Sequence, residues 1–149
     1  MPRDAETGGT IVVGLDGSPA SRQALRWACW EAELTRGRVL AMSVREGPDL
    51  MPGSEFALRS RSTWRDEDAV RAALRRDVGL VATTAPIDEL VVTGEPADEL
   101  LSAANEADLL VLGSKGPRGL SALPLGGVAA ECIRRAVCPL VLVPAAPAR

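Results

Sequence analysis

The chain has 149 residues, of which 46% are hydrophobic, and a net charge of −3 at pH 7. The modest negative charge, with acidic and basic residues interleaved, argues against a nucleic-acid-binding protein, because such proteins present a concentrated positive surface. The length and composition suit one compact domain with a full core, so we expect a single soluble domain over residues 1–149, with its core at about 10–144.

Histidine and cysteine usage narrows the chemistry further. Histidine is absent, which excludes Ser-His-Asp and Cys-His catalysis as well as histidine metal sites. The three cysteines, Cys29, Cys132 and Cys138, form no C-x-x-C pair, so we expect neither a disulfide framework nor a thiolate metal site. The N-terminus shows no apolar signal segment, and no run reaches the roughly 18 apolar residues of a membrane span. These features predict a cytoplasmic protein.

The first half of the chain predicts two strands and two helices. Residues 10–17 form a nearly continuous apolar run bounded by glycine, which is typical of a strand buried on both faces of a parallel sheet. A helix is expected at 19–36 and a second strand at 37–44. An irregular connection is expected at 46–63, because prolines and glycines interrupt it, and a second helix at about 64–81.

The first predicted helix has two apolar rows. One row faces the sheet, and Gly37 is expected to end the helix. The other row consists of Trp27, Trp30 and Leu34, which we interpret as packing residues rather than a surface that stacks on bases.

The second half repeats the alternation. A strand is predicted at 88–95, and a helix begins at Pro96, a residue suited to a first helical turn. A fourth strand is predicted at 107–114, a helix beginning at 126–127, and a fifth strand at 138–144. Strands that alternate with helices in this order indicate a three-layer α/β domain with an open parallel sheet. Ligands of such sheets bind beyond the carboxyl ends of the strands, which directs attention to the loops after the first and fourth strands.

The loop after the first strand reads "GLDGSPAS" and places Asp16 at the strand end. It is neither the G-x-G-x-x-G fingerprint of dinucleotide-binding domains nor a Walker loop, which argues against a Rossmann dehydrogenase and an ordinary P-loop ATPase. The Asp16 carboxylate can accept hydrogen bonds from a ligand. The alternative interpretation is that Asp16 only caps the loop before the helix.

The loop after the fourth strand, "GSKGPRGLSALPLGG", is rich in glycine. We expect Gly113 and Gly116 to let the backbone turn tightly and approach a ligand. A positive side chain, Lys115 or Arg118, would balance an anionic ligand. The alternative interpretation is that these glycines only allow a long turn.

The end of the same loop opens a helix. The N–H groups of Gly126, Gly127 and Val128 are expected to be unsatisfied donors of the first helical turn, where the helix dipole adds partial positive charge. Such a helix start suits a phosphate group.

Four stretches of the chain resemble the universal stress protein family. They read "IVVGLDGS", "VVTGEPADELLSAANEADLLVLGSKG", "GLSALPLGGVA" and "CPLVLVP", and the likeness spans Ile11 to Val143. The resemblance implies a Rossmann-like, five-stranded parallel sheet with strand order 3-2-1-4-5. It also implies a homodimer formed through the last strand, whose apolar "PLVLV" would otherwise be an open edge.

Nucleotide-binding members of that family have glycine, two residues, glycine, nine residues, glycine, then serine or threonine. Gly113, Gly116 and Gly126 match this pattern, whereas Gly127 stands where the family has a hydroxyl residue. The resemblance implies an ATP site, with or without Mg²⁺, in which Asp16 and Val44 flank adenine and ribose and Leu112 and Gly113 form the floor. The phosphate-side residues are then Gly116, Gly126, Gly127 and Val128, and we add Lys115 to the site as their counter-charge.

We therefore expect an ATP-binding regulatory stress-response protein that acts as a homodimer. Asp16 is the only acid predicted beside the ligand and has no proton relay, so at most slow hydrolysis is expected and the protein is not an enzyme. The alternative is an adaptor dimer of the same fold that binds no nucleotide, which Gly127 favours. An adenylating or pyrophosphatase enzyme of related fold would need an S-G-G-x-D-S-like loop, and this loop offers only Asp16 and Ser18.

Overall fold

The structure is a computed structural model. It describes residues 8–46, 66–115 and 125–145, in which strands alternate with helices. The first strand and helix are β1 (Thr10–Gly14) and α1 (Pro19–Thr35), followed by β2 (Arg38–Arg45) and α3 (Glu67–Gly79). The remaining elements are β3 (Ile87–Thr93), α4 (Pro96–Ala104), β4 (Leu109–Gly113), α5 (Gly127–Arg135) and β5 (Leu140–Val143). No helix in the described residues is both long and apolar enough to cross a membrane.

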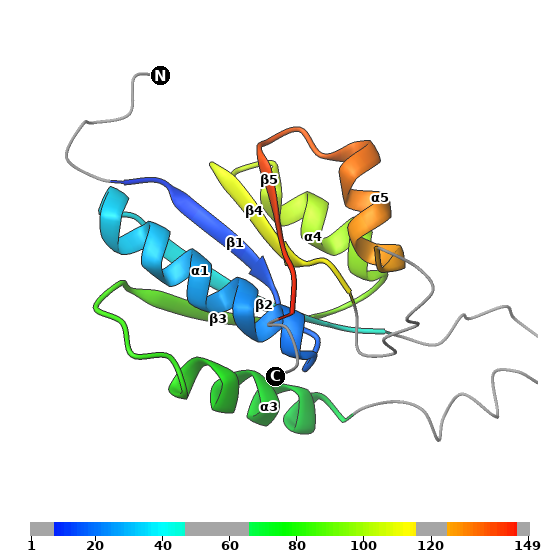
Figure 1. The fold of residues 1–149 in the computed structure, drawn as a ribbon. Coiled ribbons are helices and arrows are strands. Elements are labelled where there is room, and N and C mark those ends of the chain that lie inside the picture. The colour runs from blue at the N-terminus through cyan, green and yellow to red at the C-terminus, as the bar shows by residue number, and fades with distance from the viewer. Residues whose placement is uncertain (1–7, 47–65, 116–124, 146–149) are drawn as a thin grey trace, which may run out of the picture.

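All five strands form one parallel sheet in the order β3-β2-β1-β4-β5 (Figure 1). The register places Val12 of β1 opposite Leu40 of β2 on one side and Leu110 of β4 on the other. The chain therefore adds β2 and β3 on one side of β1, and then adds β4 and β5 on the other side. This confirms the predicted open sheet with strand order 3-2-1-4-5.

Helices cover both faces of the sheet and divide the core into two clusters (Figure 1). Successive strand residues point to opposite faces, so Val13 packs with α1 and α3, whereas Val12 packs with α4 and α5. Leu25 of α1 and Leu110 of β4 are fully buried, one in each cluster. Burying such a side chain stabilises the fold by about 1.5–3 kcal/mol, which explains why nearly continuous apolar runs form the central strands.

The predicted helices are confirmed, with small differences at their ends. Helix α1 ends at Thr35, and Arg36, rather than Gly37, takes the left-handed conformation with φ of 57°. Gly37 is glycine for another reason, because a Cβ there would lie 2.5 Å from the carbonyl oxygen of Gly9. Helix α3 begins at Glu67, capped by the Asp66 side chain. Residues 47–65, which hold most of the expected irregular connection, lie outside the described residues.

The interpretation of the second apolar row of α1 as packing residues is only partly right. Trp27 is half-buried and packs against the core, but Trp30 is 55% exposed and Leu34 is 63% exposed. The residues of α1 that pack against the sheet lie on one face of the helix, and the row of Trp27, Trp30 and Leu34 lies to the side of that face. Trp30 borders a depression of about 320 Å³ beside the chain segment that follows α3, which includes Leu80.

Candidate nucleotide site

The sheet brings the two loops singled out from the sequence together. Strands β1 and β4 are parallel neighbours, with Val13 opposite Val111, so both loops begin at the carboxyl ends of the strands, at the same end of the sheet. Asp16 lies two residues beyond β1, and Lys115 lies two residues beyond β4. The Ser18 Oγ donates a hydrogen bond to the Lys115 carbonyl oxygen at 3.4 Å, which joins the loops directly. The strand order reverses between these strands, and this is where open α/β sheets bind ligands.

Asp16 lies exposed in the first of these loops. Its Oδ1 accepts a hydrogen bond from the Ser18 N–H at 2.9 Å, and Gly17 makes the turn with φ of 83°. The predicted capping role is therefore present in modified form, because Ser18 itself caps α1 by accepting from the Ser21 N–H. The second carboxylate oxygen of Asp16 accepts no hydrogen bond from a described residue. It is oriented by the turn and accessible to a donor group on a ligand.

Gly113 ends β4 directly against the first turn of α1. A Cβ at Gly113 would lie 2.7 Å from the Ala20 carbonyl carbon and 2.8 Å from the Ser21 nitrogen. Gly113 thus makes a close approach to α1, and its expected approach to a ligand stays a prediction. Glycine here lets the strand and the helix pack without a side chain between them.

Leu112 and Val44 are positioned mainly by the core. The Leu112 side chain is only 4% exposed, and its Cδ2 lies 2.8 Å from the position of a Cβ on Gly14. Val44 is half-buried, pairs with Val92 across β2 and β3, and packs against the same cluster. Leu112 can therefore contribute to a site floor chiefly through its backbone, whereas Val44 retains some exposed surface at the carboxyl end of β2.

Lys115 is half-buried at the end of the described part of the second loop. Its carbonyl oxygen is engaged by Ser18, and its ammonium group makes no ion pair with any residue that the structure describes. Gly116 and Arg118, which the sequence also suggested, lie outside the described residues.

The start of α5 corrects one expectation and supports another. Gly126 is the N-cap, and its N–H is not a free donor, because it donates to the Ser114 carbonyl oxygen at 2.8 Å. Gly127 and Val128 open the helix, so their N–H groups lack partners within it, and no side chain caps this end. Residues 8–46, 66–115 and 125–145 supply no other acceptor for these two donors. Of the three donors predicted from the sequence, Gly127 and Val128 are therefore available to an anion and Gly126 is not.

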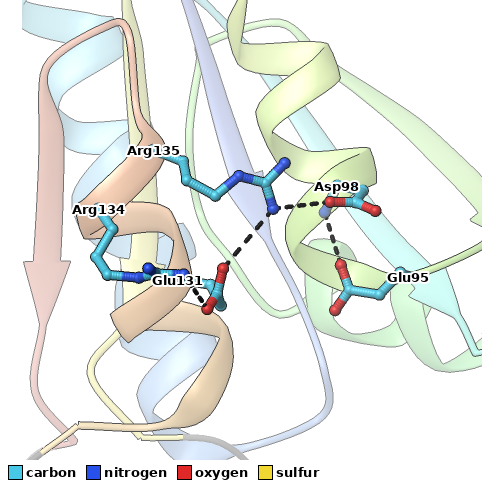
Figure 2. Close-up of polar contacts among 5 residues, drawn as sticks. All are labelled: Glu95, Asp98, Glu131, Arg134 and Arg135. Atoms are coloured by element: carbon cyan, nitrogen blue, oxygen red, sulfur yellow. Dashed lines mark hydrogen bonds and ion pairs between the residues drawn. The ribbon is translucent and has the colours of Figure 1, made fainter.

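Ion pairs attach α5 to α4 on the outside of the molecule (Figure 2). Arg135 Nη1 lies 2.8 Å from Asp98 Oδ1 and 3.7 Å from Glu131 Oε2, and Glu131 also pairs with Arg134. Glu95 caps α4 by accepting from the Asp98 N–H at 2.9 Å. The hydrogen bond to Asp98 raises the pKa of Arg135. These side chains are exposed, so they align the two helices while adding little stability.

Two cysteines lie in the core rather than in the site. Burial raises the pKa of Cys132 to about 11, and burial also raises the pKa of Cys29. Both thiols therefore stay protonated near neutral pH. Neither is an effective nucleophile, because only the thiolate attacks readily. In the described residues, no group of three or more potential ligand side chains could hold a metal ion.

A family model described as the universal stress protein family matches residues 9–144. The chain belongs to this family. Three solved universal stress proteins illustrate the likeness. One in complex with cAMP is 27% identical, with 94% of this chain and 99% of that chain covered and a TM-score of 0.63. One from Lactobacillus plantarum is 18% identical, with 95% and 99% covered and a TM-score of 0.68.

The third, from Archaeoglobus fulgidus in complex with dAMP, is 22% identical, with 90% of this chain and 96% of that chain covered and a TM-score of 0.54. Among curated proteins, none matches the chain.

Two features of this universal stress protein site were not found from the sequence. The Ser114 carbonyl oxygen holds the N-cap of α5, and the Ser114 N–H donates to the Val143 carbonyl oxygen at 2.9 Å. Backbone contacts of this kind leave no pattern of residue types. Ser18 does carry a signal, because serine directly before Pro19 is typical of a helix N-cap. That signal indicates the cap and gives no sign of the second bond to Lys115.

Proposed function

We propose that this universal stress protein binds ATP between the loops that follow β1 and β4, and acts as a regulatory protein in a stress response. The observation that carries the proposal is the uncapped start of α5, whose Gly127 and Val128 donors lie at the same sheet edge as Asp16. An anionic group suits the helix start, and a hydroxyl or amino donor suits the carboxylate. A nucleotide supplies both.

Solved relatives support the class of ligand. The 27% identical relative is in complex with cAMP, and other family members are in complexes with dAMP and AMP. ATP carries the same adenine base and has two more phosphates than AMP. We propose that Asp16 and Val44 contact adenosine, and that Lys115, Gly116 and the start of α5 contact the phosphates, together with Mg²⁺ if the nucleotide carries it.

Nucleotide analysis of the purified protein tests the proposal. Protein purified without added nucleotide is denatured, and the released small molecules are separated by ion-exchange chromatography and weighed by mass spectrometry. We expect ATP in the supernatant, or its recovery after the protein is incubated with ATP and passed through a desalting column. Release of another nucleotide would identify that nucleotide as the ligand. Absence of nucleotide both in the purified protein and after incubation with ATP would contradict the proposal.

ATP is expected to raise the thermal unfolding midpoint more than GTP at equal concentration. The proposed base site has backbone groups and apolar Val44, and a purine with different donors and acceptors would leave some of them unpaired. Differential scanning fluorimetry over a concentration series gives both shifts, and equal shifts would contradict an adenine-specific site.

Gly127→Ser is expected to tighten ATP binding. Nothing lies within 4 Å of a Cβ at Gly127, so the serine fits, and its hydroxyl adds a donor beside the free N–H groups. A hydrogen bond to a charged group contributes about 1.5–3 kcal/mol, which is roughly a 10- to 150-fold change in affinity. Position 127 lies inside the first turn and Gly126 is the cap, so the gain does not come from capping.

Titration calorimetry with ATP and with adenosine separates a phosphate contact from a general effect of Gly127→Ser. We expect the gain for ATP alone. An equal gain for adenosine, or none for either ligand, would place residue 127 away from the phosphates.

We further propose that the protein regulates rather than catalyses. Asp16 is held in a turn by the Ser18 N–H and has no described proton relay, so fast hydrolysis has no general base in the described residues. A nucleotide-dependent change in partner binding would then be the output, with hydrolysis slow at most.

The proposed homodimer uses β5, which lies at one edge of the sheet. Its four residues, Leu140 to Val143, are apolar and only half-buried. An apolar strand with an open edge pairs readily with another strand, and a second copy of this chain would cover it.

Leu142→Lys is expected to convert the dimer to a monomer, because the charge would be buried in the interface without a partner. Sedimentation velocity at micromolar concentration measures the change. Leu90→Lys, on β3 at the opposite edge, is the matched control and should leave the dimer intact. A wild-type monomer would refute the assembly.

The alternative function is an adaptor dimer that binds no nucleotide. Gly127 favours it, because the family's hydroxyl residue is missing there. In that case the protein would release no nucleotide and respond to none, while the dimer would remain.

A further inference from the structure

Three hydrogen bonds of the Ser18 N–H and hydroxyl group meet at one buried point of the candidate site. The N–H donates to Asp16 Oδ1 at 2.9 Å, and the Oγ accepts from the Ser21 N–H at 3.1 Å. The same Oγ donates to the Lys115 carbonyl oxygen at 3.4 Å, across 97 positions of sequence. The residue is only 2% exposed, so water does not readily replace these partners.

No other hydrogen bond in the described residues links the loop holding Asp16 with the loop holding Lys115. Gly113 presses the end of β4 against Ala20 and Ser21, so the loops are in contact whether or not Ser18 bonds to Lys115. Packing of this kind brings the backbones together but does not set the direction of the Lys115 carbonyl. Among the described residues, the Ser18 hydroxyl is the group that bonds to this carbonyl.

We propose that Ser18 is a positioning residue that sets the Asp16 carboxylate and the Lys115 peptide at a fixed separation. The inference rests on the proposed function, and it adds that binding at the adenosine end and binding at the phosphate end are coupled through one hydroxyl. A ligand that spans both loops gains from this preorganisation, because the Asp16 carboxylate and the Lys115 carbonyl lose less freedom on binding. A ligand that meets only the Asp16 side gains little.

Ser18→Ala removes the hydroxyl, and Ser21→Ala is the matched control. Ser21 is equally buried in the same turn. Its Oγ donates to the Ser18 carbonyl oxygen at 2.9 Å and accepts from the Asp16 N–H at 3.4 Å, so it contacts the Asp16 loop but not Lys115. Ser18→Thr keeps a hydroxyl group that can cap the helix and bond to Lys115, so it should keep the ATP affinity that Ser18→Ala loses. Chemical denaturation shows how much stability each variant loses, so that binding is compared only between folded proteins.

We expect Ser18→Ala to weaken ATP binding about tenfold and adenosine binding by no more than about twofold, as measured by titration calorimetry. Ser21→Ala should change the two affinities in equal proportion. A second readout needs no ligand: the ¹³C chemical shift of the Lys115 carbonyl, which accepts the bond from Ser18, should change in Ser18→Ala and much less in Ser21→Ala.

Equal losses for ATP and adenosine in Ser18→Ala, or an unchanged Lys115 carbonyl shift in that variant, would overturn the positioning role while wild-type ATP binding stands. Wild type that binds neither ligand would instead overturn the proposed function, and the coupling with it. The two failures are therefore distinguished by the wild-type titration.

Discussion

Gly113→Ala is expected to lower the free energy of unfolding by about 1–3 kcal/mol, a large effect for one added methyl group. The new Cβ would lie 2.7 Å from the Ala20 carbonyl carbon and 2.8 Å from the Ala20 Cβ. Backbone cannot move aside as a flexible side chain can, so β4 and α1 must separate. Urea denaturation followed by circular dichroism measures the loss.

Gly79→Ala is the matched control for this effect of packing. It adds the same methyl group near the end of α3, where no atom lies within 4 Å. Alanine is the better helix former, so stability should be unchanged or higher. Similar stability of Gly113→Ala and wild type would show that the contact between β4 and α1 is looser than these distances indicate.

Gly126→Val is expected to weaken ATP binding by more than about 100-fold while leaving the domain folded. Gly126 has φ of −71° and ψ of 160°, an extended conformation that valine adopts readily. Its N–H can still donate to Ser114. The branched side chain would occupy the space before the first turn of α5, where a phosphate must approach the Gly127 and Val128 donors.

Calorimetric titration with ATP, with circular dichroism as the check of folding, tests Gly126→Val. Gly126→Ala is the graded control, because its single methyl should cost much less affinity. A folded Gly126→Val protein that binds ATP as wild type does would remove the start of α5 from the site.

The layout of the sheet could be predicted from the sequence, because burial on both faces imposes continuous apolar runs. Leu110, Val111 and Leu112 are all buried at the centre of β4, as their run indicated. The exposure of Trp30 could not be predicted. An aromatic residue on a helix normally marks a buried face, and which face is covered depends on how α1 and α3 meet in space.

The sequence predicted that the two candidate-site loops lie side by side, but not the hydrogen bonds between and within them. Asp16 and Lys115 follow neighbouring strands, so the topology alone brings them together. The sequence does not show that Gly126 donates to Ser114, because that bond joins backbone groups across the loop. Nor does it show that Gly113 is glycine to accommodate α1, because a glycine that approaches a helix and one that approaches a ligand look alike in sequence.

Whether ATP binds between the loops after β1 and β4 is tested most directly by ¹H–¹⁵N correlation spectra of the labelled protein during titration with ATP. We expect the largest shifts at backbone amides of these loops and the start of α5, namely Gly17, Ser18, Ser114, Lys115, Gly127 and Val128. Amides beside the depression between α1 and the segment after α3, such as those of Arg26 and Leu80, should stay in place. No shifts at saturating ATP, or shifts confined to that depression, would contradict binding at this edge of the sheet.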